Sequence, residues 1–338
     1  MSEKLKIAVP MAGLGTRMRP HTWSKPKPLI ALAGRTVLDY VLEQFNSLPD
    51  PDNVEYVFIV GPNQRDQVEA HMHQHHPEKQ VHYVIQEKMR GQSDALYLAR
   101  EYLTGPVLMA FSDTLIETDL SILKNLQLDG MAWVRAVPDP RRFGVAVADS
   151  LGNITRLVEK PQDMSNNLVV VGFYYFREGR ELMRAIEEQM KRNVTLKNEF
   201  FLADAVNILL EWGQKFRINP VDVWLDAGIP EALLETNRYL LEHGHDNSAE
   251  AARTHPGAAI IPPVYIHPTA SIESSVIGPY VSLSEECKLR QVVVQNSIFD
   301  EGAHVSQMVL DKSLLGRDVQ VQGQTSRLNL GDSSWAMS

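Results

Sequence analysis

The chain has 338 residues, of which 44% are hydrophobic and 22% are charged, and its formal net charge at pH 7 is −9. This length is large for a single hydrophobic core and favours two domains. The negative balance, without a basic domain, argues against a nucleic-acid partner. No apolar run reaches the ~18 residues that a membrane span requires, so no membrane association is expected.

Cysteine usage and the N-terminus suggest where the chain works. Cys287 is the single cysteine, which excludes an internal disulfide framework and suits a reducing compartment. Residues 1–10 contain no signal-peptide core ahead of the first expected strand. We therefore expect a cytoplasmic protein.

Strands and helices alternate through the first part of the chain. Apolar runs predict strands, and apolar residues on one helical face predict helices. The expected strands are 5–9, 56–60, 81–86 and 107–111, and the expected helices are 36–45, 63–76 and 91–103. Short connections between alternating elements indicate parallel strands with right-handed crossovers. The expected fold class is therefore α/β, with a Rossmann-like, mostly parallel sheet that binds ligands beyond the carboxyl ends of its strands.

The middle of the chain is richer in strands and ends in a polar segment. Expected strands are 131–137, 143–148, 154–158 and 168–176, followed by helices 178–192 and 200–212, a strand leading to 224–226 and a helix over 230–243. Residues 245–259 are polar, rich in small residues and without periodicity. They are predicted to be a linker.

The sequence changes character from Ile260 onwards. Short apolar residues recur at a spacing of about six, as in the pairs Ile266 and Ile272 or Val281 and Cys287. This spacing is typical of left-handed parallel β-helices, in which six residues form one side of a triangular coil. A short left-handed β-helix of roughly three or four coils is therefore expected over 260–322, with the edge of a β-sandwich as the alternative. The tail, 323–338, shows no clear pattern.

A glycine-rich segment directly follows the first strand. Residues 8–29 read AVPMAGLGTRMRPHTWSKPKPL. Gly13 and Gly15 allow the backbone to approach a bulky anion, and successive N–H groups in such a turn form an anion-binding concavity. Arg17 adds a planar donor fork and Lys27 a mobile point charge. The segment therefore predicts a polyphosphate cradle.

The spacing of this segment excludes two other phosphate loops. A P-loop requires G-x-x-x-x-G-K-[ST], and neither Lys-Ser nor Lys-Thr follows these glycines. The dinucleotide-binding fingerprint requires a third glycine where this chain has Met18.

The run G-T-R-M-R-P followed by P-K-P-L resembles the signature of the sugar-phosphate nucleotidyltransferases, the nucleoside-diphosphate-sugar pyrophosphorylases. The resemblance covers about residues 5–244 and implies a nucleotidyltransferase domain over 1–244. Where the family commonly has L-A-G-G, this chain has P-M-A-G, so an alanine replaces one glycine. The resemblance implies that the nucleotide is bound by Ala12, Gly13, Gly15 and Thr16, and that Arg17 and Lys27 are catalytic.

The family's reaction is attack by a sugar 1-phosphate oxygen on the α-phosphorus of a nucleoside triphosphate, with pyrophosphate leaving. Such a transfer requires in-line positioning and neutralised phosphate charge. The resemblance implies that Asp113, after the strand 107–111, and Asp226, in the run W-L-D-A-G, hold Mg²⁺ beside the triphosphate. Each aspartate could instead be a turn or helix-start residue.

Base recognition is expected from Gln86 and Gly91. A glutamine amide can both donate to and accept from the imide edge of uracil or thymine. Ser93 and Asp94 depart from the usual family pattern, which leaves the base preference open. Gln92 and Asp94 are expected to be exposed residues at a helix start.

The sugar phosphate is expected to meet three further segments. Gly144, in R-F-G-V, resembles the residue whose N–H faces a sugar hydroxyl. Glu159 and Lys160, in E-K-P, resemble the residues that bind sugar hydroxyls and the sugar phosphate, with Lys160 also catalytic. Gly172 lies in a segment that resembles the lining of the hexose site. A solvated salt bridge is the alternative for the Glu-Lys pair.

Four histidines lie close together at positions 71, 73, 75 and 76. His71 and His75 are four apart on an expected helix, but their surroundings are polar and no Cys or Asp completes a ligand set. A solvated helix end is the favoured interpretation.

The leading functional hypothesis is an enzyme that forms a nucleoside-diphosphate hexose, most simply from glucose 1-phosphate and dTTP or UTP. GTP with mannose 1-phosphate is an alternative. A non-catalytic scaffold subunit of the same fold is another, although such a subunit would be free to lose the five charged residues Arg17, Lys27, Asp113, Lys160 and Asp226. Acyl transfer by the C-terminal coils is disfavoured because too few coils are present. The coils are expected to support a homo-oligomer.

Overall fold

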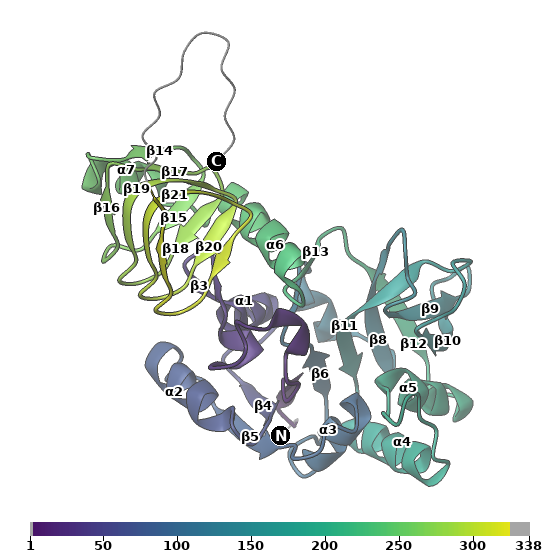
Figure 1. Ribbon diagram of the computed structural model, residues 1–338. Coiled ribbons are helices and arrows are strands. Elements are labelled where there is room, and N and C mark those ends of the chain that lie inside the picture. The colour runs from purple at the N-terminus through teal and green to yellow at the C-terminus, as the bar shows by residue number, and fades with distance from the viewer. Residues whose placement is uncertain (1–2, 325–338) are drawn as a thin grey trace. The chain divides into compact units, whose positions relative to one another are not determined.

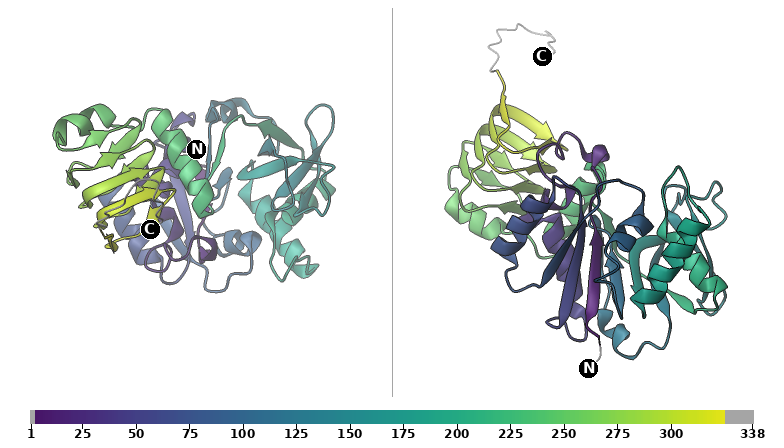
Figure 2. Two further views of the ribbon diagram at one scale, coloured as in Figure 1. Left: turned by 45° about the horizontal axis from the view of Figure 1, so that its top comes forward. Right: turned by 90° about the horizontal axis from the view of Figure 1, so that it is seen from below.

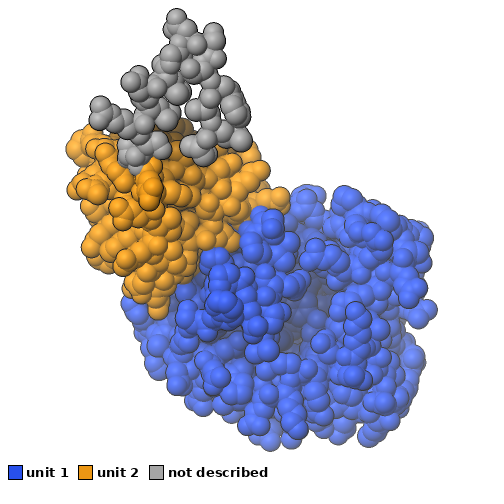
Figure 3. Space-filling model, viewed as in Figure 1, with its two compact units in different colours: residues 1–30, 35–233 blue, residues 31–34, 234–338 orange. Residues whose placement is uncertain are grey.

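The computed structural model describes residues 3–324, and these divide into two compact units (Figure 3). Of the described residues, unit 1 contains 3–30 and 35–233, and unit 2 contains 31–34 and 234–324. The expected tail, 323–338, lies almost wholly outside the described residues. No helix within residues 3–324 is long and apolar enough to cross a membrane.

Unit 1 is built on one large sheet (Figure 1). Its main path runs in the order β10 (Ile154–Glu159), β9 (Gly144–Ala148), β11 (Leu168–Phe176), β6 (Val107–Ala110), β1 (Leu5–Pro10), β4 (Val54–Val60) and β5 (Val81–Ile85). Off this path, β8 (Gly130–Ala136) pairs with β11 and with β12 (Phe216–Pro220).

The two halves of this sheet differ in strand direction. Strands β6, β1, β4 and β5 are mutually parallel, as the alternation of strands and helices predicts. Strand β11 runs antiparallel to β6, β8 and β9, because no crossover helix separates the strands in this part of the chain. The central strand β1 is buried on both faces, with Ile7, Ala8 and Val9 fully inaccessible, which explains its continuous apolar run.

Helices of unit 1 lie alongside both halves of its sheet (Figure 2). Their bounds are α1 (Val37–Glu43), α2 (Arg65–His75), α3 (Gln92–Leu98), α4 (Gly179–Lys191) and α5 (Leu202–Glu211). A sixth helix, α6 (Pro230–Glu242), begins in unit 1 and belongs to unit 2 from Leu234 onwards. Helices α3, α4 and α5 share one core with sheet residues such as Ala8, Val57 and Met109. Helix α3 is shorter than the expected 91–103, because turns follow from Ala99.

Several short elements complete this part of the chain. Four 3-10 helices are η1 (Thr16–Met18), η2 (Lys27–Leu29), η3 (Gln44–Ser47) and η4 (Leu120–Asn125), and the short strands are β2 (Ala31–Leu32), β3 (Arg35–Thr36), β7 (Thr114–Ile116) and β13 (Trp224–Asp226). Strands β7 and β13 form a separate antiparallel pair. Two- and three-residue strands carry too little periodicity to be read from the sequence, and β7 was not expected.

Unit 2 contains parallel strands in two sheets. One sheet has β14 (Ala259–Ile260), β16 (Ser271–Glu273), β17 (Val276–Ile277), β19 (Lys288–Gln295), β21 (His304–Asp311) and β23 (Gln320–Gln322); the other has β15 (Val264–Ile266), β18 (Val281–Leu283), β20 (Ser297–Phe299) and β22 (Leu314–Leu315).

The pairing in unit 2 repeats along the chain at nearly constant spacing. Val264 lies beside Val281, and Val281 beside Ser297, which are steps of 17 and 16 residues. Strands β19 and β21 each pass through a residue with positive φ, Gln291 and Gln307, and so contribute to two sides of a coil. Parallel pairing at this repeat is the pattern expected of a parallel β-helix. Its left-handedness stays a prediction.

The segment 245–259, predicted to be a linker, contains a helix, α7 (Ser248–Thr254). The Ser248 hydroxyl accepts a hydrogen bond from the Val264 amide at 2.9 Å, and the Asn247 side chain accepts one from the Ile266 amide at 2.8 Å. This helix therefore satisfies backbone donors of β15, the first strand of its sheet. Only Ser248 and Ala251 are buried, which leaves no apolar periodicity for the sequence to show.

Candidate active site

Unit 1 contains a cleft of about 560 Å³ beyond the carboxyl ends of β1 and β6. Its walls come from the loop after β1, from the segment between β5 and α3, and from the end of β6. The lining residues that were predicted for the site are Ala12, Gly13, Gly15, Thr16, Arg17, Lys27, Gln86, Gly91 and Asp113. The structure thus brings together the loop, the base-recognition residues and one predicted metal ligand.

The loop after β1 contains two glycines, Gly13 and Gly15, that leave its backbone accessible. Gly15 has a φ of 59°, and a Cβ there would lie 2.9 Å from the Thr22 side chain, whose hydroxyl donates to the Gly15 carbonyl at 2.8 Å. Gly13 is exposed, and a Cβ built there would meet nothing within 4 Å. Ala12 is 3% exposed, so its methyl group is packed and leaves the cleft free. The loop therefore presents exposed backbone at the cleft.

Two positively charged side chains, those of Arg17 and Lys27, lie beside this loop. Arg17 is exposed on η1, directly after Gly15 and Thr16. Lys27 begins η2, where the neighbouring prolines restrict its backbone, and its ammonium forms an ion pair with Asp113. The Lys27 side chain is only 12% exposed, so this charge is fixed in position as well as paired.

The two predicted metal ligands lie close together, because Asp226 is the last residue of β13 and Asp113 directly precedes β7. In the β7–β13 pair, Asp226 is opposite Thr114, so it lies next to Asp113, whose carbonyl accepts a hydrogen bond from the Ala227 amide at 3.0 Å. Burial raises the pKa of Asp226, and the charge of Asp113 raises it further. The Gly228 amide, which donates to Asp226 Oδ1 at 2.7 Å, acts in the opposite direction.

This arrangement of carboxylates fits a divalent cation. Two neighbouring carboxylates repel each other, and a hard cation bound by both would offset that repulsion. Asp113 remains 25% exposed to solvent in its side chain, so it is accessible from the cleft that it lines. Oxygen donors of this kind suit Mg²⁺ rather than a softer metal.

Gln86 is held by a network that the sequence did not predict. It is 4% exposed and donates from Nε2 to Asp94 Oδ2 at 2.9 Å and to the Gly91 carbonyl at 3.2 Å. Gly91 has a φ of 102°, and a Cβ there would lie 2.5 Å from the Phe200 carbonyl oxygen. Both features restrict the conformation of the segment predicted to recognise the base.

The expectation that Asp94 is exposed is wrong. Asp94 is 2% exposed and accepts from Arg90 at 2.5 Å as well as from Gln86. Burial of this carboxylate is possible because Arg90 neutralises it. The i,i+4 spacing of Arg90 and Asp94 was a signal in the sequence. Gln92 is half-buried, and its side chain accepts from the Leu202 amide at 3.4 Å.

The predicted sugar-side residues lie outside the lining of this cleft but close to one another. Gly144 is opposite Glu159 in the β9–β10 pair, and a Cβ at Gly144 would lie 2.9 Å from Glu159 Oε2. Lys160 has a φ of 47°, and its backbone amide donates a hydrogen bond to the Phe143 carbonyl at 2.9 Å. Its side-chain ammonium lies 4.2 Å from the centre of the Phe201 ring.

Glu159 has an unusual protonation equilibrium. Burial raises its pKa to about 7, and the charges of Asp204 and Glu199 act in the same direction, whereas Lys160, 3.8 Å away, lowers it. Glu199 lines the cleft, so the sugar-side group and the cleft are linked electrostatically. A carboxyl group with a pKa near 7 can accept or donate a hydrogen bond at neutral pH.

Gly172 lies against Phe111, an aromatic residue that lines the cleft. Its φ is 77°, and a Cβ there would lie 2.1 Å from Cδ2 of Phe111, which lines the cleft. The Phe111 amide donates to the Gly172 carbonyl at 3.0 Å. Trp224, two residues before Asp226, packs edge-on against Phe143 at 5.1 Å between ring centres, so β13 contacts the loop that precedes β9. Neither aromatic contact was predicted, because nothing local in the sequence marks it.

A glycine loop at a strand end, fixed basic groups and adjoining carboxylates in an α/β sheet define a phosphate-binding enzyme of the nucleotidyl-transfer class. The chain belongs to the nucleotidyl transferase family, whose model matches residues 9–243. It is a sugar-phosphate nucleotidyltransferase.

Relatives of known name agree with this assignment. A glucose-1-phosphate thymidylyltransferase of Streptomyces griseus is 28% identical over 361 residues, which is 98% of this chain and 99% of the relative. The bifunctional protein GlmU of Methanocaldococcus jannaschii is 29% identical over 68% of this chain and 53% of its own length. Among solved structures, a UDP-glucose pyrophosphorylase complexed with UDP-glucose covers 71% of this chain and all of that one, with a TM-score of 0.59 and 20% identity.

Proposed function

We propose that this enzyme condenses glucose 1-phosphate with dTTP or UTP, releasing pyrophosphate and forming the corresponding nucleoside-diphosphate glucose. The observation that carries the proposal is the cleft lined by the glycine loop, Arg17, Lys27 and Asp113, with Asp226 opposite the residue that follows Asp113. Full-length similarity to glucose-1-phosphate thymidylyltransferases supports the choice of sugar and base.

The phosphate groups are held by the loop and its basic residues. The exposed backbone around Gly13 donates to the β- and γ-phosphates, and Arg17 offers a bidentate fork to the same groups. Lys27, released from Asp113 by the incoming anion, lies against the α-phosphate. These positive groups stabilise charge that moves onto the leaving pyrophosphate, which is the main demand of phosphoryl-type transfer.

Asp113 and Asp226 are the residues that would hold Mg²⁺ beside the triphosphate. A bound Mg²⁺ supplies positive charge that offsets the phosphate oxygens. The two aspartates contribute carboxylate oxygens at one end of the β7–β13 pair, where Asp226 is the last residue of β13 and Asp113 directly precedes β7. The Gly228 amide that donates to Asp226 Oδ1 orients that carboxylate.

The sugar phosphate is held by the segment around β10. Lys160 neutralises its phosphate and keeps the attacking oxygen in line, while Glu159 hydrogen-bonds sugar hydroxyls. The ring of Phe201 and the amide bond to Phe143 restrict where the Lys160 side chain can reach. Positioning of this kind supplies a large part of the rate enhancement in two-substrate reactions.

Pyrophosphate release tests the substrate assignment. The purified enzyme is assayed with ATP, GTP, CTP, UTP and dTTP against the 1-phosphates of glucose, galactose, mannose and N-acetylglucosamine. The highest kcat/KM is expected for glucose 1-phosphate with dTTP or UTP. A preference for GTP with mannose 1-phosphate would overturn the assignment of sugar and base, and no turnover with any pair would favour a scaffold role.

A further inference from the structure

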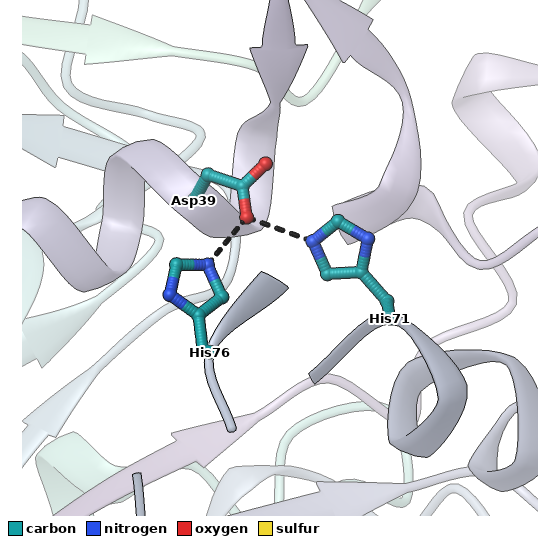
Figure 4. Close-up of side chains that lie close together, drawn as sticks. All are labelled: Asp39, His71 and His76. Atoms are coloured by element: carbon teal, nitrogen blue, oxygen red, sulfur yellow. Dashed lines mark hydrogen bonds and ion pairs between the residues drawn. The ribbon is translucent and has the colours of Figure 1, made fainter. Parts of the chain in front are cut away.

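Asp39, His71 and His76 meet at a second site in unit 1 (Figure 4). They come from separate elements: Asp39 lies on α1, His71 on α2, and His76 directly follows α2. None of the three lines the 560 Å³ cleft. The group is therefore distinct from the candidate active site.

The expectation of a solvated helix end is wrong for two of the four histidines. The side chains of His71 and His76 are 12% and 19% exposed, and that of Asp39 is 11% exposed. His73 and His75 remain exposed. No local pattern marks this group, because the aspartate that completes it lies 32 residues before His71.

The donor atoms converge on a small volume. Nε2 of His71 and Nε2 of His76 each lie 2.7 Å from the same oxygen, Oδ1 of Asp39. The donor atoms of the three residues all lie within 4.8 Å of one another. Donors bound to one tetrahedral ion lie about 3.3 Å apart, as follows from bond lengths of ~2.0–2.1 Å. A small outward movement of the rings would therefore admit a metal ion.

The carboxylate is oriented for this role by its other oxygen. Oδ2 of Asp39 accepts from the Thr36 amide and from the Thr36 hydroxyl, each at 2.8 Å. These bonds are part of the capping box that begins α1. Oδ1 is left facing the imidazoles, and hydrogen bonds to the second oxygen of a ligating carboxylate are typical of protein metal sites.

We propose that Asp39, His71 and His76 bind a divalent transition-metal ion such as Zn²⁺, with water as the fourth ligand. Two imidazole nitrogens and one carboxylate oxygen are a donor set that suits Zn²⁺, whereas Mg²⁺ prefers oxygen donors alone. The ion would link the start of α1 to the end of α2. Its expected consequence is a more stable unit 1.

Calorimetric titration of metal-free, tag-free protein with Zn²⁺ tests the proposal. To remove competition from the candidate active site, the titration is done in the Asp113→Asn, Asp226→Asn background. One equivalent of Zn²⁺ is expected to bind, and Co²⁺ is expected to give the intense visible absorption of a four-coordinate ion. Zn²⁺ in 100-fold excess over its Kd should raise Tm by about 5 °C.

Variants assign the binding to these residues. His71→Gln and His76→Gln should each weaken Zn²⁺ binding by about 100-fold or more. His73→Gln, on an exposed residue of the same helix, is the matched control and should bind as the parent does. Asp39→Asn should also lose binding, but the two histidine variants decide the outcome because they leave the α1 cap intact. Absence of binding in the parent, or equal binding in His71→Gln, His76→Gln and His73→Gln, would overturn the proposal.

Discussion

At the scale of single residues, Lys160 is where the proposed sugar-phosphate role can be tested separately from the proposed nucleotide role. Its ammonium lies 3.8 Å from Glu159 and over the ring of Phe201, and Lys160 does not line the 560 Å³ cleft. Lys160→Ala should lower kcat/KM for the sugar phosphate by ~30- to 1000-fold, which corresponds to about 2–4 kcal/mol of lost transition-state stabilisation. Binding of the nucleoside triphosphate, measured by calorimetry, should change little.

A matched control for this variant is Lys191→Ala, which removes an exposed lysine from the last turn of α4. That variant should keep the parent kinetics. An unchanged kcat/KM in Lys160→Ala would refute the sugar-phosphate assignment.

The raised pKa of Glu159 makes the stability of the fold depend on pH. The folded-state pKa of about 7 exceeds the ordinary value of 4.5, so the unfolded chain releases this proton first. Stability should therefore fall as pH rises between about 4.5 and 7, by at most about 3 kcal/mol. Glu159→Gln cannot ionise, so its stability relative to the parent should increase over the same interval.

Urea unfolding of both proteins at pH 5 and pH 8 measures this difference. A stability difference between Glu159→Gln and the parent that is the same at both pH values would show that Glu159 is already ionised at pH 5.

For single residues, the sequence predicted which residues belong to the candidate site, but it did not predict the burial and the hydrogen-bond partners of several of them. The segments around Gly15, Lys27 and Asp113 could be assigned because each has its own local pattern. Burial of Asp94 depends on Arg90 and Gln86, and burial of His71 depends on Asp39. Environments that depend on distant partners are set by tertiary packing, which a local pattern does not contain.

At the scale of elements, the segment before α3 depends on a glycine. Gly91 has φ 102° and ψ −179°, a region that is essentially restricted to glycine, and a Cβ would also strike the backbone of Phe200. Gly91→Ala should destabilise the fold by about 2–4 kcal/mol and raise KM for the nucleoside triphosphate, because Gln86 donates to the Gly91 carbonyl.

Gly213→Ala is the control that isolates the clash. Gly213 also has positive φ, 85°, but a Cβ there would meet nothing within 4 Å. It should cost about 1 kcal/mol and leave KM unchanged. Equal unfolding midpoints for the two variants would show that the Phe200 contact is relieved at little cost.

Long elements were predictable and short ones were not. Strands such as β1, β4 and β11 matched their expected positions because continuous apolar runs mark strands that are buried on both faces. Helix α7 was not predicted because it buries only two small residues, and β7 was not predicted because it has only three residues. Contacts with segments elsewhere in the chain stabilise these elements.

At the scale of the whole molecule, the coils of unit 2 are proposed to mediate self-association. Val309 is 78% exposed and lies beside Val293, which is 47% exposed, in the β19–β21 pair. Adjacent exposed valines on a sheet are costly to leave in water and suit a contact with a second copy. Deletion after Leu241 should therefore lower the oligomer mass measured by light scattering.

The truncated chain retains all the residues proposed for the reaction, and it should keep pyrophosphate release if it stays folded. Val309→Lys is a milder test, since an exposed side chain can be replaced without disturbing the core. An unchanged oligomer mass in a soluble truncation would refute the assembly role, and a folded but inactive truncation would show that the coils complete the active site.

The paired carboxylates are central to the proposed chemistry, and the most direct test is the rate of pyrophosphate release across a Mg²⁺ titration. Asp113→Asn and Asp226→Asn keep the side-chain shape but remove the charge that a hard cation requires. Each should abolish turnover at every Mg²⁺ concentration while circular dichroism shows an intact fold. Asp119→Asn, at an exposed aspartate before η4, should behave as the parent does. Near-parent turnover in Asp113→Asn and Asp226→Asn would contradict the account.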